Sequence, residues 1–197
     1  MADDQSIIWT GLAIDITEQK NLQNKIQILN KQLNEQAETD YLTGLINRRR
    51  FYSDIKKQFN RFERYDEIFC LAIIDLDNFK SINNHYGHEI GDELLKHFSK
   101  ILKSKIRNTD VCSRIGGEEF ALFFPHTTLE EGILICERII SEIKFIENSK
   151  NNNSKIVYTC SIGLTEVTDG DIFSNVFNRA DQKLYNAKNN GKNQLKY

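Results

Sequence analysis

Residues 69–80 read FCLAIIDLDNFK, a short apolar run that ends in two aspartates. Six apolar residues in succession, from Phe69 to Ile74, are typical of a central strand that is buried on both faces. Asp75 and Asp77 follow at once and share one face, because side chains alternate along a strand. Sheets of α/β proteins bind ligands beyond the carboxyl ends of their strands. The run therefore predicts a central strand that leads to a polar site; a solvent-facing strand end is the alternative for Asp77.

Helices and strands alternate on both sides of this run. Apolar residues spaced three and four apart predict amphipathic helices, and short apolar or β-branched runs predict strands. The helices are expected over residues 48–65, 89–106, 130–146 and 173–187, and further strands over 156–167 and 194–197.

Residues 110–125, DVCSRIGGEEFALFFP, contain two strand-like runs around a pair of glycines, which predicts a β-hairpin. Gly116 and Gly117 are expected at the turn because glycine tolerates positive φ and lets a ligand approach the backbone. Alternating elements that include an antiparallel hairpin indicate an α/β (α+β) fold, with a mixed central sheet surrounded by helices.

The N-terminal segment, residues 1–38, is expected to be distinct from a globular domain over residues 39–197. Its apolar residues alternate in steps of four and three, which predicts a helix with a coiled-coil seam of about two heptads. The seam residues are Leu22, Ile26, Leu29 and Leu33. A coiled coil would join two copies of the chain into a homodimer; a single amphipathic helix packed on its own domain is the alternative.

The composition of the 197 residues is that of an ordinary globular protein. A net charge of −2 and a pI near 6.1 supply no basic surface, which argues against nucleic acid as a partner. No apolar run approaches the length of a membrane span, and the N-terminus lacks the pattern of a secretory signal. The four cysteines lack zinc or redox spacing and are expected to be buried thiols in a reducing compartment. These features predict a cytoplasmic protein without a membrane partner in this chain.

Two glutamates, Glu118 and Glu119, follow the paired glycines in the tight turn. Neighbouring carboxylates repel each other unless a cation or another partner offsets their charge. Magnesium is usually held by one or two carboxylates together with substrate phosphates. If the hairpin lies beside the central strand, Asp75 and Glu118 can share one metal ion. A solvated hairpin tip is the alternative, and it accounts for the glycines but not for the two acids.

A third polar group lies in SINNHYGHEIGDELL, residues 81–95. Asn83, His88 and Asp92 surround a glycine turn and the start of a helix, and His88 and Asp92 share a helix face. A carboxylate can accept hydrogen bonds from the ring N–H and the amino group of guanine, while an amide pairs with the remaining edge. The group therefore predicts a guanine site, with helix capping and helix-dipole stabilisation as the alternative.

Five motifs occur in order along the chain: DYLTGLINRR from Asp40, DLDNFK from Asp75, NNHYGHEIGD from Asn83, RIGGEEF from Arg114 and DQKLYNAKNNGKN from Asp181. Together they resemble the GGDEF-family diguanylate cyclases, from about Asp40 to the C-terminus. The resemblance implies the family's fold and its activity, the condensation of two GTP molecules into cyclic di-GMP by a dimer that holds one GTP in each subunit. A catalytically silent domain that binds GTP or cyclic di-GMP as a signalling module is the alternative.

The segment before these motifs has a second, shorter resemblance. WTGLAIDITEQK, residues 9–20, is similar to the end of a PAS domain that continues into a signalling helix. The apolar run over residues 7–16 predicts a strand. A strand with no neighbour to pair with leads us to expect the end of a truncated upstream domain.

The family resemblance also implies roles for single residues. Mg²⁺, or Mn²⁺ in its place, would be held by Asp75, the carbonyl of Leu76 and Glu118. Glu118 would also act as the base, and Lys80 would stabilise phosphate charge. The substrate would contact Asn83, His88, Asp92, Glu119, Lys188 and Lys192. Lys192 departs from the family, which usually carries arginine there, and lysine lacks the bidentate fork of arginine.

Arg107 and Asp110 form an R-x-x-D motif upstream of the paired glycines. Its spacing resembles the family's inhibitory product site, and Arg138 on the following helix matches the second arginine of that site. Guanidinium groups can stack on guanine and pair with phosphate, and a carboxylate can accept from guanine N–H groups. The resemblance therefore implies feedback inhibition by cyclic di-GMP; a surface salt bridge between Arg107 and Asp110 is the alternative.

Overall fold

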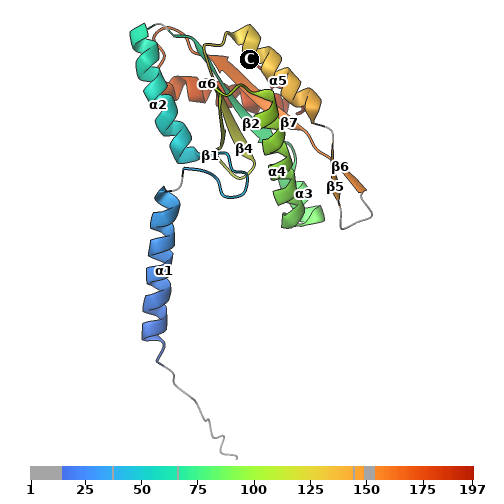
Figure 1. Cartoon of the computed structure of the whole chain (residues 1–197). Coiled ribbons are helices and arrows are strands. Elements are labelled where there is room, and N and C mark those ends of the chain that lie inside the picture. Colours follow the sequence, from blue (N-terminus) through green and yellow to red (C-terminus); the bar gives the residue numbers. More distant parts are fainter. Residues whose placement is uncertain (1–14, 37, 66, 144, 149–153) are drawn as a thin grey trace, which may run out of the picture. The chain divides into compact units, whose positions relative to one another are not determined.

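The computed structural model describes residues 15–36, 38–65, 67–143, 145–148 and 154–197. The chain divides into two compact units, Met1–Ala37 and Glu38–Tyr197, whose elements are drawn in Figure 1. In the first unit, helix α1 spans Thr17–Gln36, and the carboxylate of Asp15 accepts a hydrogen bond from the Thr17 N–H at its start. The helix expected there is confirmed. The strand expected over residues 7–16 lies outside the described residues apart from Asp15 and Ile16, which are not in a strand.

The second unit is built on a six-stranded mixed sheet with the order β1-β3-β4-β2-β7-β8. Its strands are β1 Ile46–Asn47, β2 Phe69–Leu76, β3 Val111–Arg114, β4 Glu119–Pro125, β7 Cys160–Glu166 and β8 Leu195–Lys196. Strand β2 is antiparallel to β4 on one side and to β7 on the other. All of its residues are buried. The central strand, the β3–β4 hairpin and the C-terminal edge strand are therefore confirmed.

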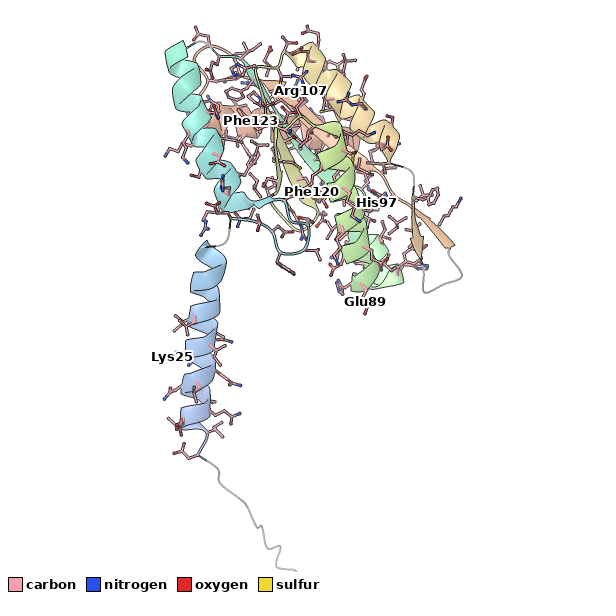
Figure 2. All side chains as sticks on the ribbon, in the orientation of Figure 1. Lys25, Glu89, His97, Arg107, Phe120 and Phe123 are labelled. Atoms are coloured by element: carbon pink, nitrogen blue, oxygen red, sulfur yellow. The ribbon has the colours of Figure 1, made fainter. Side chains whose placement is uncertain are left out.

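Helices cover both faces of this sheet (Figure 1). One face carries α2 Arg48–Tyr65 and α6 Phe173–Asn189, and the other carries α3 Phe79–Tyr86, α4 His88–Lys105 and α5 Leu129–Glu142. Alternation along β2 divides the core between the faces, because odd-numbered residues pack towards α2 and α6 and even-numbered residues towards α4 and α5. Strand β4 does the same: Phe120 packs on Phe98 of α4, and Phe123 packs on Phe69 on the opposite face (Figure 2).

Two expected elements differ from the observed ones, and strand β1 and the short helix α3 were not expected. Helix α3 begins after Asn78, which has a positive φ of 59°. The helix expected over residues 130–146 ends at Glu142, and Phe145–Asn148 instead forms strand β5. The strand expected over residues 156–167 is two strands, because β6 Ser154–Val157 pairs with β5 in a separate ribbon and β7 begins at Cys160.

The cysteines and the helices bear on two further expectations. All four cysteines are buried free thiols, as predicted, and burial raises the pKa of the Cys70 and Cys112 thiols to about 12. Among the residues that the structure describes, no helix is both long and apolar enough to cross a membrane.

Candidate active site

The carboxyl end of β2 concentrates charged side chains. Asp75, only 7% exposed, lies on the face of the sheet that α6 covers, and its Oδ2 is 2.7 Å from Nζ of Lys188 in that helix. Burial raises the pKa of Asp75, the Lys188 ammonium opposes this rise, and the charges of Glu118 and Glu119 add to it. A cation in addition to Lys188 would relieve this crowding of negative charge.

The hairpin lies beside β2, as the shared-metal hypothesis requires. Glu119 is the register partner of Asp75 on β4, and the N–H of Leu76 donates to the carbonyl of Glu118 at 3.3 Å. Both glutamates are partly exposed. The structure thus brings together Asp75, Leu76, Glu118 and Glu119 from two separate segments of the chain.

The positive φ expected at the paired glycines is wrong, since neither Gly116 nor Gly117 has one. A Cβ atom at Gly116 would instead collide with Oε2 of Glu119 and lie 3.2 Å from its Cβ. A Cβ atom at Gly117 would meet nothing within 4 Å. A side chain at position 116 would therefore displace the Glu119 carboxylate, which folds back over the glycine.

Two further lysines lie around this acidic end. Nζ of Lys192, in the loop after α6, donates to Oδ1 of Asn78 at 2.6 Å, immediately beyond β2. Lys80 is the second residue of α3 and is exposed. The three lysines that the sequence assigned to phosphate binding therefore lie on α3 (Lys80), on α6 (Lys188) and in the loop after α6 (Lys192).

Asp77 does not face solvent, contrary to the alternative reading of the sequence. It is 3% exposed, and its carboxylate accepts hydrogen bonds from Thr159 Oγ1 and Ser161 Oγ, both at 2.7 Å. Sequence reasoning missed Thr159 and Ser161, because nothing local marks two hydroxyl residues more than eighty positions away as partners of an aspartate.

The candidate guanine residues lie on the α3–α4 pair, which follows β2 directly. Asn83 of α3 packs against Gly91 of α4, and its Oδ1 is buried without a hydrogen-bond partner among the described residues. His88 and Asp92 occupy the first two turns of α4 and are exposed. An exposed carboxylate and imidazole beside an amide whose oxygen is buried can bind a polar planar base, in keeping with the guanine hypothesis.

If the α3–α4 pair binds GTP, as the family resemblance implies, Gly91→Ala is expected to weaken that binding by about tenfold while the protein stays folded. The new methyl group would collide with Oδ1 of Asn83 and lie 3.0 Å from its Cγ, so the amide must move. Alanine also favours a helix interior over glycine by about 1 kcal/mol, which offsets part of the crowding. The KM for GTP measures the effect on binding, and the circular dichroism spectrum shows whether the variant is folded. An unchanged KM in the folded variant would contradict the role of Asn83.

Arg107, Asp110 and Arg138 lie at the far end of α4. Figure 2 shows Glu89 near one end of this helix and Arg107 beyond the other. The 18 residues of the helix span about 27 Å. The carboxylate of Asp110 accepts from the backbone N–H of Arg107 at 2.7 Å, and Arg138 donates to the carbonyl of Lys105. Arg107 and Arg138 line one hollow of about 650 Å³, together with Ser104, Lys105, Ile106, Glu131, Leu134 and Ile135.

The donor set at the end of β2 suits one kind of metal. Among the described residues, no three His, Cys, Asp or Glu side chains are arranged to enclose a metal ion. Asp75 and the partly exposed Glu118 are two hard oxygen donors at an open edge. Magnesium is held in this way, by one or two carboxylates, with water and phosphate oxygens completing its shell.

Comparison with known proteins identifies the family. The family described as "Diguanylate cyclase, GGDEF domain" matches residues 37–194. The chain is 36% identical over 184 residues to a diguanylate cyclase of Vibrio cholerae, covering 93% of this chain and 54% of that protein. It spans about half the length of the curated relatives it matches.

Solved structures agree with this result. The GGDEF domain of DgcB from Caulobacter crescentus, in complex with c-di-GMP, has a TM-score of 0.79 and 30% identity, over 81% of this chain and 95% of that one. The coiled coil and GGDEF domain of the same protein also has a TM-score of 0.79, with 26% identity, over 92% and 96% of the two chains. The chain therefore belongs to the GGDEF-domain family of diguanylate cyclases.

Proposed function

We propose that this protein condenses two molecules of GTP into cyclic di-GMP and two pyrophosphates. The observation that carries the proposal is the juxtaposition at the end of β2: Asp75 faces Lys188 and lies beside Glu118 and Glu119, and the α3–α4 pair with its polar group follows at once. The names of the relatives agree with the proposal.

Members of this family are generally dependent on a divalent metal ion. We assign the ion as Mg²⁺, with Mn²⁺ as a substitute, held by Asp75, Glu118 and the carbonyl of Leu76. When bound, it lowers the pKa of the attacking hydroxyl and neutralises phosphate charge. Glu118 would accept the proton of the 3′-hydroxyl, whose oxygen attacks the α-phosphorus of the second GTP, and pyrophosphate leaves. The same attack by the 3′-hydroxyl of the second nucleotide on the α-phosphorus of the first closes the ring and releases the second pyrophosphate. Lys80, Lys188 and Lys192 balance the charge of the triphosphate, and Glu119 contributes to the substrate site.

Guanine is selected by Asn83, His88 and Asp92 in this proposal. Adenine offers an acceptor where guanine offers its ring N–H, so the Asp92 carboxylate would face an acceptor. A mismatch that becomes buried on binding costs about 1–3 kcal/mol. The decisive experiment incubates the purified protein with Mg²⁺ and either GTP or ATP, and separates the products by chromatography. Cyclic di-GMP from GTP, with little product from ATP, is the expected result. Equal turnover of both nucleotides would contradict the guanine assignment.

A silent nucleotide-binding module is the second candidate. The feature that favours it is Lys192, a lysine where the family usually carries arginine, whose ammonium is engaged by Asn78. The retained set of Asp75, Glu118, Asn83 and Asp92 favours the enzyme. The same assay separates the two, because a silent module would bind GTP or cyclic di-GMP without forming product.

Because all four cysteines are free thiols, we also place the protein in the cytoplasm.

Truncation to a chain that starts at Glu38 should give a folded but mainly monomeric protein with low specific activity at low concentration. Each subunit would supply one GTP, so two catalytic domains must face each other, and proximity then controls the rate. Leu22, Ile26 and Leu29 of α1 are about half exposed, as expected of a seam that packs on a second copy. Sedimentation and activity across a dilution series measure both effects. Equal specific activity at every concentration, with and without α1, would show that the helix is not the dimer contact.

Feedback inhibition is assigned to the hollow of Arg107 and Arg138. Because it lies at the opposite end of α4 from Asp92, the product bound there would not displace GTP directly but would hold the domains apart. We expect initial rates to fall as cyclic di-GMP reaches about micromolar levels. Arg107→Ala should keep full activity and lose this inhibition. Unchanged inhibition in the variant would show that Arg107 serves only the local turn.

A further inference from the structure

Asp77 is a buried carboxylate with donors from two other segments of the chain. Its Oδ2 accepts from Thr159 Oγ1 at 2.7 Å and from the backbone N–H of Asn193 at 3.0 Å, and its Oδ1 accepts from Ser161 Oγ at 2.7 Å. Its own N–H donates to the carbonyl of Thr159. A carboxylate is costly to bury unless such hydrogen bonds replace water. Asp77 thus joins the loop after β2, the start of β7 and the loop after α6.

The two loops that Asp77 joins are held in unusual conformations. Asn78, Lys192 and Asn193 have positive φ values of 59°, 64° and 46°. Residues with side chains adopt this region rarely and keep it when the surroundings hold them. Nζ of Lys192 crosses between the same loops and donates to Asn78 at 2.6 Å. Asp77, through the N–H of Asn193, therefore fixes the backbone from which Lys192 extends.

We propose that Asp77 is a positioning residue that fixes Lys192 beside the end of β2 and so sets the preference of the site for a triphosphate over a diphosphate. The inference rests on the proposed function, in which Lys192 holds the terminal phosphates. A point charge contributes only when it is held at the right distance from the phosphate. Releasing the Asn193 N–H lets the loop move, so the terminal phosphate loses a contact that GDP never makes.

A carboxylate that only stabilises the fold would behave differently, and the chain offers one for comparison. Asp171 is 8% exposed and accepts from Arg179 at 2.7 and 2.8 Å and from the N–H of Thr168 at 2.8 Å. It follows β7 at the end opposite Asp75, since Cys70 at the start of β2 pairs with Glu166 at the end of β7. Asp171→Asn therefore removes a similar buried acceptor far from the phosphates.

The test measures binding without turnover. Wild type, Asp77→Asn and Asp171→Asn are titrated calorimetrically with α,β-methylene-GTP and with GDP in the presence of Mg²⁺. We expect Asp77→Asn to weaken binding of the triphosphate roughly three- to tenfold and to leave GDP unchanged. Asp171→Asn should lower the melting temperature and keep both affinities. Equal losses for both nucleotides, no loss at all, or the same selective loss in Asp171→Asn would overturn the proposal.

Lys192→Ala separates this inference from the function on which it rests. The same selective loss is expected in that variant. If Lys192→Ala keeps the preference for the triphosphate, the phosphate role of Lys192 is wrong and the inference falls with it. If Lys192→Ala loses the preference while Asp77→Asn keeps it, only the role of Asp77 is wrong.

Thr159→Val covers the case in which Asp77→Asn does not fold, because it removes one donor and keeps the carboxylate. We expect faster hydrogen exchange of the Asn193 amide and a smaller loss of triphosphate affinity in the same direction. Unchanged exchange and unchanged affinity would overturn the proposal.

Discussion

Asp75→Asn and Glu118→Gln are each expected to lower the rate of cyclic di-GMP formation by about a thousandfold or more. Both changes keep the size of the side chain and remove the negative charge that a divalent ion needs. Loss of metal-assisted activation of the hydroxyl and of phosphate neutralisation costs several kcal/mol of transition-state stabilisation. The rate is measured by chromatography of the products at saturating GTP and Mg²⁺. Asp75 also pairs with Lys188 at 2.7 Å, so the folded state of the Asp75 variant is checked by thermal unfolding.

Asp171→Asn is the control for this experiment. It also removes a buried, ion-paired carboxylate, but one that lies at the opposite end of β7 and pairs with Arg179. We expect it to destabilise the protein while its folded fraction turns over GTP at the normal rate. Near-normal activity in either Asp75→Asn or Glu118→Gln would refute the metal assignment.

Gly163→Ala is expected to destabilise the protein by about 3 kcal/mol or more, at the upper end of overpacking costs. A Cβ atom at Gly163 in β7 would collide with the carbonyl of Ala180 and the N–H of Leu184, and would lie 2.9 Å from the Cα of Leu184. These are backbone atoms of α6, so no rotamer change relieves the contact, and the helix must move off the sheet. A loss of this size lowers the melting temperature by roughly 6–12 °C in a protein of this length.

The displacement should also reach the active site. Lys188 lies one turn beyond Leu184 on α6 and pairs with Asp75 across this interface. We therefore expect Gly163→Ala to lose activity even below its melting temperature. Gly132→Ala in α5 is the matched control, because the atoms nearest to a Cβ there are side-chain atoms of Leu164 and Cys70, at 3.3–3.4 Å. A stability change in Gly163→Ala as small as in this control would show that α6 does not depend on the close approach.

Periodic burial made much of the fold predictable from the sequence. Helix α2 was expected over the residues it occupies, and β2, the β3–β4 hairpin, α4 and α6 were placed within a few residues. The acidic residues after β2 and in the hairpin also suggested that Asp75 and Glu118 could share a metal if the hairpin lay beside the central strand, and the structure places it there. Such patterns can be recognised because each element buries one face, so apolar residues recur along the sequence at the spacing of a helix or a strand.

The sequence alone determined the helices and strands with a strong apolar period and the residue types that gather at the end of β2. Tertiary structure decided the partners of individual polar atoms and the ends of weakly patterned elements. Phe145 pairs with Val157 in a ribbon although its neighbours continue a helical pattern, and Gly163 matters only because α6 returns to cover it. Asp77 is buried because Ser161 and Asn193, 84 and 116 residues away, supply its hydrogen bonds. A local pattern records how often a side chain must face the core, but the atom it meets there comes from a distant part of the chain.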